Sequence, residues 1–349
     1  MRNKIFEVFL KSLIKLLEIL AVTKWTDKID QSKINGRDLV LIEGAKRRHL
    51  KIENLLFQSK PTRFFRIKKN GRIYFYETMP LGNSHNRFSQ EQVDNKWFQK
   101  KILWQKNIPI ADGRLVSNVD DALRYVALKS YPVVIKPISE SRCQGVTINI
   151  RTEKELLGAI KEAQQYDRKF LIEEFLVGQS YRVAVVNNKI VAVCLRKPPQ
   201  IIGSGIHSIA KLIKIKNSDP RRQGPTLCPI KVDQKLLKEQ NLNLQSIPKK
   251  NQLVILNQKI NLGSGSDIID MTEQIHPTIA RLCLKIVKIF DAQVLGLDIL
   301  TPDITKRYDR KNPLYLIEIN TLPFIDMHHH PWEGKTRDVA GAIWRMVLN

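Results

Sequence analysis

Residues 314–323 read LYLIEINTLP, an apolar run that ends with two oxygen-bearing side chains, Glu318 and Asn320. Side chains two positions apart on a strand point to the same face of a sheet, so both oxygens share one face. Upstream, the run VLGLDIL at 294–300 presents Asp298. Two neighbouring strands could thus offer three ligands to magnesium, which is often held by few carboxylates together with phosphate and water. The alternative is that the carboxylates make ordinary hydrogen bonds at strand edges.

The composition indicates a globular chain long enough for two or three packed units. It has 349 residues, of which 43% are hydrophobic, so it can bury sizeable cores. The four cysteines lie far apart, with neither a CxxC motif nor the Cys/His spacing of a zinc site. This pattern argues against a secreted disulfide framework, and we expect a cytoplasmic location where thiols stay reduced.

The chain is strongly basic, with a formal net charge of +24. Such a surface can attract nucleic acid, anionic membranes or acidic small substrates. The basic residues are scattered, however, with only short clusters such as Lys46–Arg48 and Arg221-Arg222, and no basic motif is interleaved with aromatic residues. We expect no specific nucleic-acid partner, because a general bias toward Lys, Asn and Ile explains the charge more simply.

Residues 5–22, IFEVFLKSLIKLLEILAV, have the pattern of an amphipathic helix. One polar stripe recurs every three or four residues: Glu7, Lys11, Lys15 and Glu18. The wide apolar face includes Phe6, Phe9, Leu10, Leu13, Leu17 and Leu20. A transmembrane segment needs about 20 nearly uncharged residues, so none is expected here. We expect the apolar face to pack within the protein or across a homo-oligomer interface; the alternative is that it lies on a membrane surface.

The first 88 residues are expected to form a small α/β extension containing this helix and a β-hairpin region. The run FFRIKKNGRIYFYE at 64–77 is β-rich on both sides of Asn70-Gly71, which predicts a tight hairpin turn. A polar, turn-rich stretch, PLGNSHNRFSQEQ, follows. The larger domain, residues 89–349, is expected to begin there.

A strand, loop, strand, helix and strand are expected around Lys136. YPVVIKPI at 131–138 predicts a strand with the lysine at its polar end, and VTINI predicts a second strand after the loop. Thr152 and Glu155 form a capping box at the start of the helix TEKELLGAIKEAQQY, and the strand KFLIEEFLVG follows. A phosphate could lie in the loop beneath backbone N–H groups and the lysine.

Together these segments resemble the ATP-grasp superfamily of ligases. The segments that carry the likeness are, in order, Asp94–Lys96, YPVVIKP with Lys136, LIEEFLVG, Asp298 and EIN at 318–320. The middle of the chain resembles the ATP-grasp region of cyanophycin synthetase through GQSYRVAVVNNKIVAV, RKPPQIIGSGIHSIAKLI, NSDPRR, INLGSGSDIIDMTEQIHP and LGLDIL. The resemblance runs from about Ser89 to the C-terminus. It implies an α+β ATP-grasp fold, in which two subdomains clasp ATP and residues 130–178 form the lid.

The resemblance also implies ATP-dependent ligation of a carboxylate to an amine, with an amino acid or a peptide as substrate. ATP would convert the carboxylate into an acyl phosphate, which the amine would attack, so the protein would mainly position groups and stabilise charge. By the same resemblance, Lys96 and Lys136 would contact the ATP phosphates. The adenine-contacting hinge would be Glu173, Glu174, Phe175 and Leu176. Two Mg²⁺ ions, replaceable by Mn²⁺, would be held by Asp298, Glu318 and Asn320.

Three further residues are candidates for the catalytic site. Arg182, in SYRV, would contact the transferred phosphoryl group or the acyl phosphate, because guanidinium forks match phosphate oxygens; a strand-surface salt bridge is the alternative. Arg196 could orient the substrate carboxylate. Asn261, with the glycines of NLGSGS, resembles a small-residue loop beside the substrate, and a plain hairpin turn is the alternative.

The sequence departs from the family in three places. The loop at 139–145, SESRCQG, keeps only Gly145, although backbone N–H groups approach phosphate best where side chains are absent; Arg142 could replace the lost contacts. Asn257 replaces an arginine near the substrate loop. Cyanophycin synthetase also carries a Mur-ligase-like ATPase, and no GxxxxGK[ST] loop occurs here, so we expect a single ligation step. The alternative function is a non-catalytic nucleotide-binding module that interacts with an acidic partner.

Three adjacent histidines, His328 to His330, precede the last segment of the chain. Neighbouring side chains on a strand alternate in direction, so a shared metal ion is not expected. A substrate-side or structural role is the hypothesis that remains. A final helix is expected to begin at Gly334-Lys335.

Overall fold

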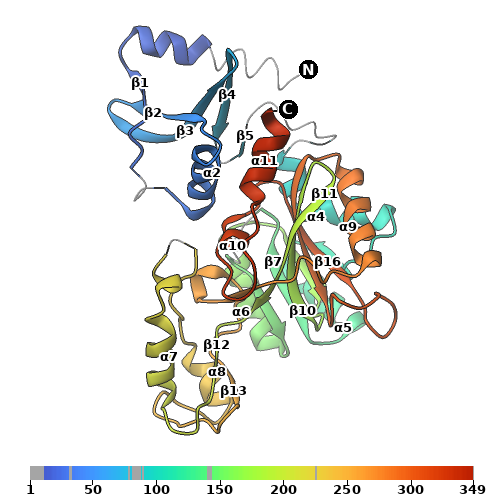
Figure 1. Ribbon diagram of the computed structural model, residues 1–349. Helices are drawn as coiled ribbons and strands as arrows, with labels where there is room; N and C mark the ends of the chain where they lie inside the picture. The colour runs from blue at the N-terminus through green and yellow to red at the C-terminus, as the bar shows by residue number, and fades with distance from the viewer. Residues whose placement is uncertain are drawn as a thin grey trace.

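The computed structural model describes residues 12–30, 34–77, 79–80, 88, 90–139, 144–224 and 226–348. In this part of the chain, two sheets of five strands, one of four and one of two are connected by helices. Figure 1 shows the N-terminal sheet at one end of the molecule and a small lobe at the other, with the remaining sheets between them.

The central sheet is antiparallel throughout. Its strands, in spatial order, are β14 (Asp267–Asp270), β11 (Lys189–Lys197), β10 (Gln179–Val186), β15 (Val294–Thr301) and β16 (Tyr315–Asn320). One face is apolar along its length and is covered by α9 (Pro277–Phe290). That helix buries side chains at helical spacing: Ile279, Leu282, Cys283, Ile286, Val287 and Phe290.

The opposite face of the central sheet has an apolar end and a polar end. At the apolar end, Ala184 and Ala192 pack against α2 (Gly36–Lys46) and α11 (Val339–Leu348). Side chains alternate along a strand, so the residue of β10 next to Ala184 on this face is Arg182. This end of the face is polar. The candidate site occupies this polar end.

The second sheet contains the elements predicted around Lys136. Its order is β6 (Gly113–Val116), β9 (Phe170–Glu174), β7 (Val133–Pro137) and β8 (Thr147–Ile150). Two helices, α5 (Val119–Lys129) and α6 (Glu153–Ala163), supply its core. The backbone N–H of Glu155 donates to Thr152 Oγ1 (3.3 Å), which confirms the predicted cap. The sheet therefore has the predicted strands and helix, with β6 and α5 added.

The N-terminal sheet is a meander of β1 (Thr23–Thr26), β2 (Lys51–Phe57), β3 (Lys60–Lys69), β4 (Arg72–Glu77) and β5 (Met79–Pro80). Lys69 pairs with Arg72 across the predicted Asn70-Gly71 turn, and both turn residues have positive φ, which asparagine and glycine tolerate best. The hairpin prediction is confirmed.

The N-terminal sheet shares a core with the C-terminal helix. The indole N–H of Trp344 donates to the Leu41 carbonyl (2.8 Å), and its ring meets that of Tyr76 edge-on at 5.4 Å. In Figure 1, α11 accordingly lies beside α2. The N-terminal sheet and α2 are therefore packed against the larger domain through this shared core.

The amphipathic segment is helical over residues 12–19, and only part of its apolar face is covered. Ile14 is buried against Trp25, Leu55 and Phe75. By contrast, the side chains of Leu13, Leu16, Ile19 and Leu20 are exposed. Phe6, Phe9 and Leu10 lie outside the described residues.

A small lobe, residues 198–256, lies between β11 and β14 in the sequence. It contains β12 (Gln200–Ile202), α7 (Ile209–Asn217), a 3₁₀ helix (Pro220–Gln223), α8 (Gln234–Glu239) and β13 (Leu253–Ile255). Its separate core includes Ile201, Ile209, Leu237 and Val254. The lobe projects from the central sheet at the bottom of Figure 1.

The other helices in the described part of the chain are α3 (Gln90–Asp94), α4 (Lys96–Gln105), α10 (Asp326–His329) and a 3₁₀ helix (Leu262–Ser264). The prediction that the final helix starts at Gly334 is wrong: α11 begins at Val339. Gly334 has a left-handed φ of +93°, and Asp338 accepts a hydrogen bond from the Gly341 N–H (3.0 Å), as a capping residue does. No helix in the described ranges is long and apolar enough to cross a membrane.

Candidate active site

Arg182, Asp298 and Glu318 stand side by side on three adjacent strands. Asp298 is the direct partner of Arg182 on β10 and of Glu318 on β16. The Arg182 Nε contacts Asp298 Oδ1, Nη2 donates to Oδ2 (3.1 Å), and Arg196 Nη1 lies 3.2 Å from the same Oδ2. Arg182 therefore forms a buried ion pair, not the surface salt bridge considered as its alternative.

Burial and the two arginines act in opposite directions on Asp298. Burial raises the pKa of the carboxyl group, but Arg182 and then Arg196 more than offset this effect, so the pKa is lowered. The carboxylate stays ionised inside the protein. Cys194, opposite Arg182 on β11, has a pKa raised to about 12 by burial and stays protonated.

Glu318 and Asn320 lie on the same face of β16. Glu318 Oε1 is 3.3 Å from Lys96 Nζ, and its side chain is 27% exposed. The Asn320 amide nitrogen is buried and has no hydrogen-bond partner in the described structure. Gly296 lies opposite Asn320, and a Cβ there would lie 3.0 Å from Arg182 Nη1, so the glycine makes room for the guanidinium.

The donor set at this polar end fits magnesium. Asp298, Glu318 and Asn320 supply hard oxygen atoms on one face of two paired strands. Among the described residues, no three His, Cys, Asp or Glu side chains are grouped so that they could hold a metal ion. Magnesium takes six ligands, so two carboxylates and an amide would leave positions for phosphate and water.

A second charged cluster lines a narrow cleft together with Lys96. The Glu173 carboxylate on β9 is buried between Lys100 Nζ (2.9 Å) and Lys136 Nζ (2.6 Å). Lys100 also donates to the Ala111 carbonyl (2.5 Å). Burial raises the Glu173 pKa, but the two lysines more than offset this and lower it. These residues and Lys96 line the cleft between the lid sheet and β16.

The assignment of Glu173 to the adenine-contacting hinge stays a prediction. The Glu173 carboxylate contacts two lysines, which favours a role in positioning them. Lys100 was missed by the sequence analysis, although it lies one helical turn after Lys96 on α4, so both could face the same way.

Gln99 attaches α4 to β16. Its side-chain amide donates to the Ile319 carbonyl (2.7 Å) and accepts from the Ile319 N–H (2.9 Å).

The remaining hinge residues connect β9 to β10. The Glu174 N–H donates to the Asp112 carbonyl (3.1 Å), and its carboxylate accepts from the Asp112 N–H (2.8 Å). The Phe175 N–H donates to the Pro132 carbonyl (3.1 Å). Glu174, Phe175 and Leu176 are half-buried, so this segment joins the lid sheet to the central sheet through fixed contacts.

The family model described as "D-ala D-ala ligase C-terminus" matches residues 105–252. Cyanophycin synthetase from Trichormus variabilis is 36% identical over 294 residues, which are 78% of this chain and 32% of that protein. The glutathione biosynthesis bifunctional protein GshAB of Pasteurella multocida is 30% identical over 296 residues, or 82% of this chain and 39% of that protein.

A crystal structure of a bifunctional glutathione synthetase from Pasteurella multocida superposes with a TM-score of 0.67 and 29% identity. The superposition covers 90% of this chain and 44% of the glutathione synthetase chain. The chain belongs to the ATP-grasp superfamily. It spans about a third of the length of the cyanophycin synthetase and two fifths of the GshAB protein that it matches.

The loop after Lys136 is fixed at both ends in this ATP-grasp protein. The Ser139 N–H donates to the Asp167 carboxylate (2.9 Å). Gly145 has a φ of +64°, and a Cβ there would lie 2.7 Å from the Tyr166 ring, so this position requires glycine. Residues 140–143, including Arg142, lie outside the described structure, so the proposed replacement of phosphate contacts by Arg142 stays a prediction.

The predicted substrate loop of this ATP-grasp protein is a tight turn. The Asn261 side chain accepts from the Ser264 N–H (2.8 Å), and Gly265 has a φ of +91°. A Cβ on Gly265 would lie 2.5 Å from the Ile230 Cα. The Asn261 side chain thus stabilises the turn, and its catalytic role stays a prediction.

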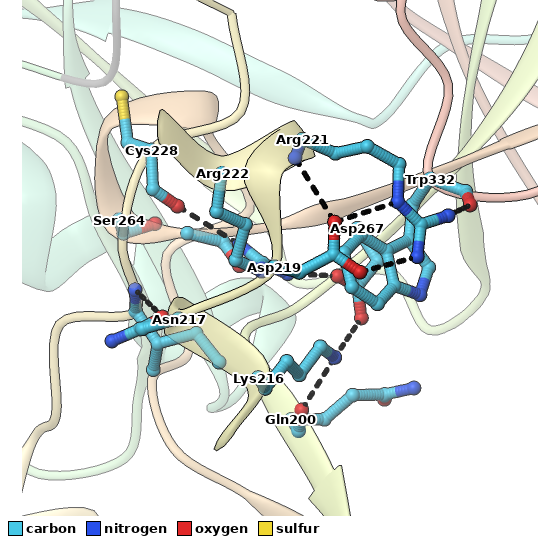
Figure 2. A network of polar contacts seen from close by, with 12 residues as sticks. Gln200, Lys216, Asn217, Asp219, Arg221, Arg222, Cys228, Ser264, Asp267 and Trp332 are labelled. Atoms are coloured by element: carbon cyan, nitrogen blue, oxygen red, sulfur yellow. Dashed lines mark hydrogen bonds and ion pairs between the residues drawn. The ribbon is translucent and has the colours of Figure 1, made fainter. Parts of the chain in front are cut away.

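A buried arginine, missed by the sequence analysis, anchors this turn to the small lobe (Figure 2). The Arg222 Nη1 donates to the carbonyls of Gly265 (3.1 Å) and Cys228 (2.8 Å), and its Nη2 contacts the Asp267 carboxylate. Lys216 Nζ lies 2.5 Å from Asp267 Oδ2. Arg222 and Lys216 therefore both bind the Asp267 carboxylate at the base of the lobe. In the sequence, only the short run PRR pointed to this arginine.

Two of the three adjacent histidines, His328 and His329, are buried. Burial lowers the pKa of His328 to about 3 and that of His329 to about 4, so both rings are neutral. His329 Nε2 accepts from the Ala340 N–H (3.1 Å) at the start of α11. In the part of the chain that the structure describes, these histidines form no metal-binding group.

Proposed function

We propose that this chain is an ATP-dependent carboxylate–amine ligase that forms an amide or peptide bond through an acyl phosphate, with an amino acid or a peptide as substrate. The observation that carries the proposal is that Lys96 joins the Arg182–Asp298–Glu318 row to the Lys100–Glu173–Lys136 cluster. Lys96 Nζ lies 3.3 Å from Glu318 Oε1, and Lys96 lines the same cleft as Lys100, Lys136 and Glu173, so cations and acidic groups adjoin there, as phosphoryl transfer requires. Amide-forming relatives support the same activity.

The lysines would bind the triphosphate and the arginines the substrate anion. Lys96 and Lys136 would contact the phosphates, while Glu173 holds Lys136 and Lys100 in place. Arg182 Nη1 and Arg196 Nε are buried and lack hydrogen-bond partners in the described structure. An anion with several acceptor oxygens, such as a carboxylate or an acyl phosphate, would satisfy both donors.

In the reaction, a carboxylate oxygen takes the γ-phosphoryl group and ADP leaves. The amine lone pair then attacks the carbonyl carbon, phosphate leaves, and the amine loses a proton. Asp298, Glu318 and Asn320 would hold two Mg²⁺ ions, or Mn²⁺, and the metal would supply positive charge beside the phosphates. The protein's own contribution is position and charge.

A homo-oligomer is the second part of the proposal. Leu16 and Ile19 on the N-terminal helix are 53% and 73% exposed, and Leu20 is 60% exposed. Apolar side chains grouped on one helix are worth about 1.5–3 kcal/mol each when fully buried. A second copy of the chain would bury them.

The competing function is a non-catalytic nucleotide-binding module. It is favoured by the loop at 139–145, which keeps only Gly145. Supplying the protein with Mg-ATP and pooled amino acids and dipeptides separates the two functions. A ligase releases ADP and phosphate only with substrate, and mass spectrometry detects an amide product that is absent with Glu318→Gln. ATP binding without substrate-dependent ADP release would overturn the ligase proposal.

A further inference from the structure

A groove of about 420 Å³ lies outside the active-site cleft. It is formed by α9, by the loop between β15 and β16, and by residues 107–109. Pro109 and Leu282 give it an apolar floor, and Thr278 and Tyr308 add hydroxyl groups. Its volume is within the range of small-molecule sites.

Three cations line this groove: Arg281 and Lys285 on α9, and Arg307 on the facing loop. The lining contains no carboxylate. None of the three forms an ion pair with a residue in the described ranges. Arg281 and Lys285 are four residues apart, so their like charges repel on the helix face.

The acidic residues of the same loop have other partners. Asp303 pairs with Lys306 (3.2 Å) and accepts from the Thr305 hydroxyl. Asp309 accepts from the backbone N–H groups of Lys311 (2.8 Å) and Asn312 (3.0 Å). Asp309 interacts electrostatically with Arg307 but forms no ion pair with it, so the loop that forms the wall balances only part of the positive charge of the groove.

We propose that this groove binds a small polyanion that carries two or more phosphate or carboxylate groups. Guanidinium groups on opposite walls match such oxygens two at a time, while the lysine supplies a point charge. The site is separate from the nucleotide cleft: Asn107 and Pro109 line the groove, whereas the next residues, Ile110 and Ala111, line the cleft.

Isothermal titration of the full chain with tripolyphosphate, in the absence of magnesium, tests the proposal. Two binding events are expected. The triple variant Arg281→Gln, Lys285→Gln, Arg307→Gln should weaken one of them about tenfold or more, as the loss of charge-assisted hydrogen bonds predicts. Lys136→Ala should weaken the other. All three groove side chains are exposed, so the variant should fold.

A matched variant, Lys154→Gln, Lys161→Gln, Arg168→Gln, removes the same charge from exposed positions on the lid. It should leave both binding events unchanged. An equal loss in this control would show diffuse attraction to a basic surface and overturn the proposal. So would a single binding event that Lys136→Ala weakens and the groove variant leaves intact. Should the triple variant unfold, Arg307→Gln alone, in the loop, must weaken the same event.

Discussion

Asp298 lies directly opposite Glu318 on the neighbouring strand, yet the two carboxylates are paired with cations from different elements. Asp298 is buried with Arg182 and Arg196 from the sheet itself, whereas the half-exposed Glu318 meets Lys96 from α4. Removal of the Asp298 carboxylate should therefore destabilise the fold more than removal of the Glu318 carboxylate. Substitutions at the two positions should separate catalysis from stability.

Glu318→Gln should abolish most ligase activity and leave the fold intact. The change removes a charge needed beside the triphosphate, but the Glu318 side chain is 27% exposed, and the glutamine oxygen can still accept a hydrogen bond from Lys96. Substrate-dependent ADP release and thermal unfolding measure the two effects. Near-normal turnover with an unchanged magnesium dependence would refute the assignment of Glu318 to the metal.

Asp298→Asn should abolish activity and also destabilise the protein. Two buried arginines would lose their counter-charge, which costs about 3–5 kcal/mol when one partner of a buried pair is removed. Urea denaturation measures the loss in the free energy of unfolding. A stability equal to that of Glu318→Gln would show that the ion pair contributes little.

Lys136→Ala should weaken ATP binding more than it disturbs folding. Glu173 would keep Lys100 as a partner, while the phosphates would lose a charge-assisted contact worth about 1.5–3 kcal/mol, or roughly tenfold to a hundredfold in Kd. Titration with ATP and thermal unfolding check both. A variant that unfolds, with a soluble fraction that binds ATP normally, would make the lysine structural.

The Glu173 carboxylate should make stability depend on acid pH. Its pKa is lowered in the folded protein from its ordinary value of 4.5, so the folded state binds fewer protons than the unfolded state. Its stabilisation is thus complete above about pH 4.5 and lost as the pH falls through the folded value. Urea midpoints at about pH 6 and about pH 4 should differ less in Glu173→Gln than in the unaltered protein. Glu153→Gln, at an exposed position, should retain the full difference.

Leu16→Lys combined with Ile19→Lys should dissociate the oligomer without loss of ATP binding. Both side chains are exposed in the single chain, and charges there would oppose burial in an interface. Sedimentation velocity measures the change, and deletion of residues 1–22 should cause dissociation or aggregation. An unchanged oligomeric state together with lost binding to anionic vesicles would favour the membrane-surface alternative.

Local patterns predicted the row of site residues but not all of their partners. Strand alternation placed Glu318 and Asn320 on one face, and the family resemblance added Arg182. Lys100 was missed because its contact with Glu173 depends on how α4 packs between two sheets, which no short pattern encodes. Arg222 was missed for the same reason: Gly265 is 43 residues away.

The start of the last helix shows a different limitation. Gly334-Lys335 was predicted to start the helix. The left-handed φ of Gly334 instead places this residue in the segment before the helix. Asp338, which precedes Val339 and accepts from the Gly341 N–H, was the better signal. The cap could have been found from the sequence, because it needs only a local hydrogen bond.

The contact between Trp344 and Leu41 affects how the chain folds during synthesis. The two residues are 303 positions apart, so the N-terminal sheet and α2 leave the ribosome long before the helix that completes their core. At a synthesis rate of about 5–20 residues per second, α11 is made roughly 15–60 s after Leu41 and Tyr76. During this interval the nascent chain presents an uncovered apolar surface, which makes it a candidate for early chaperone binding.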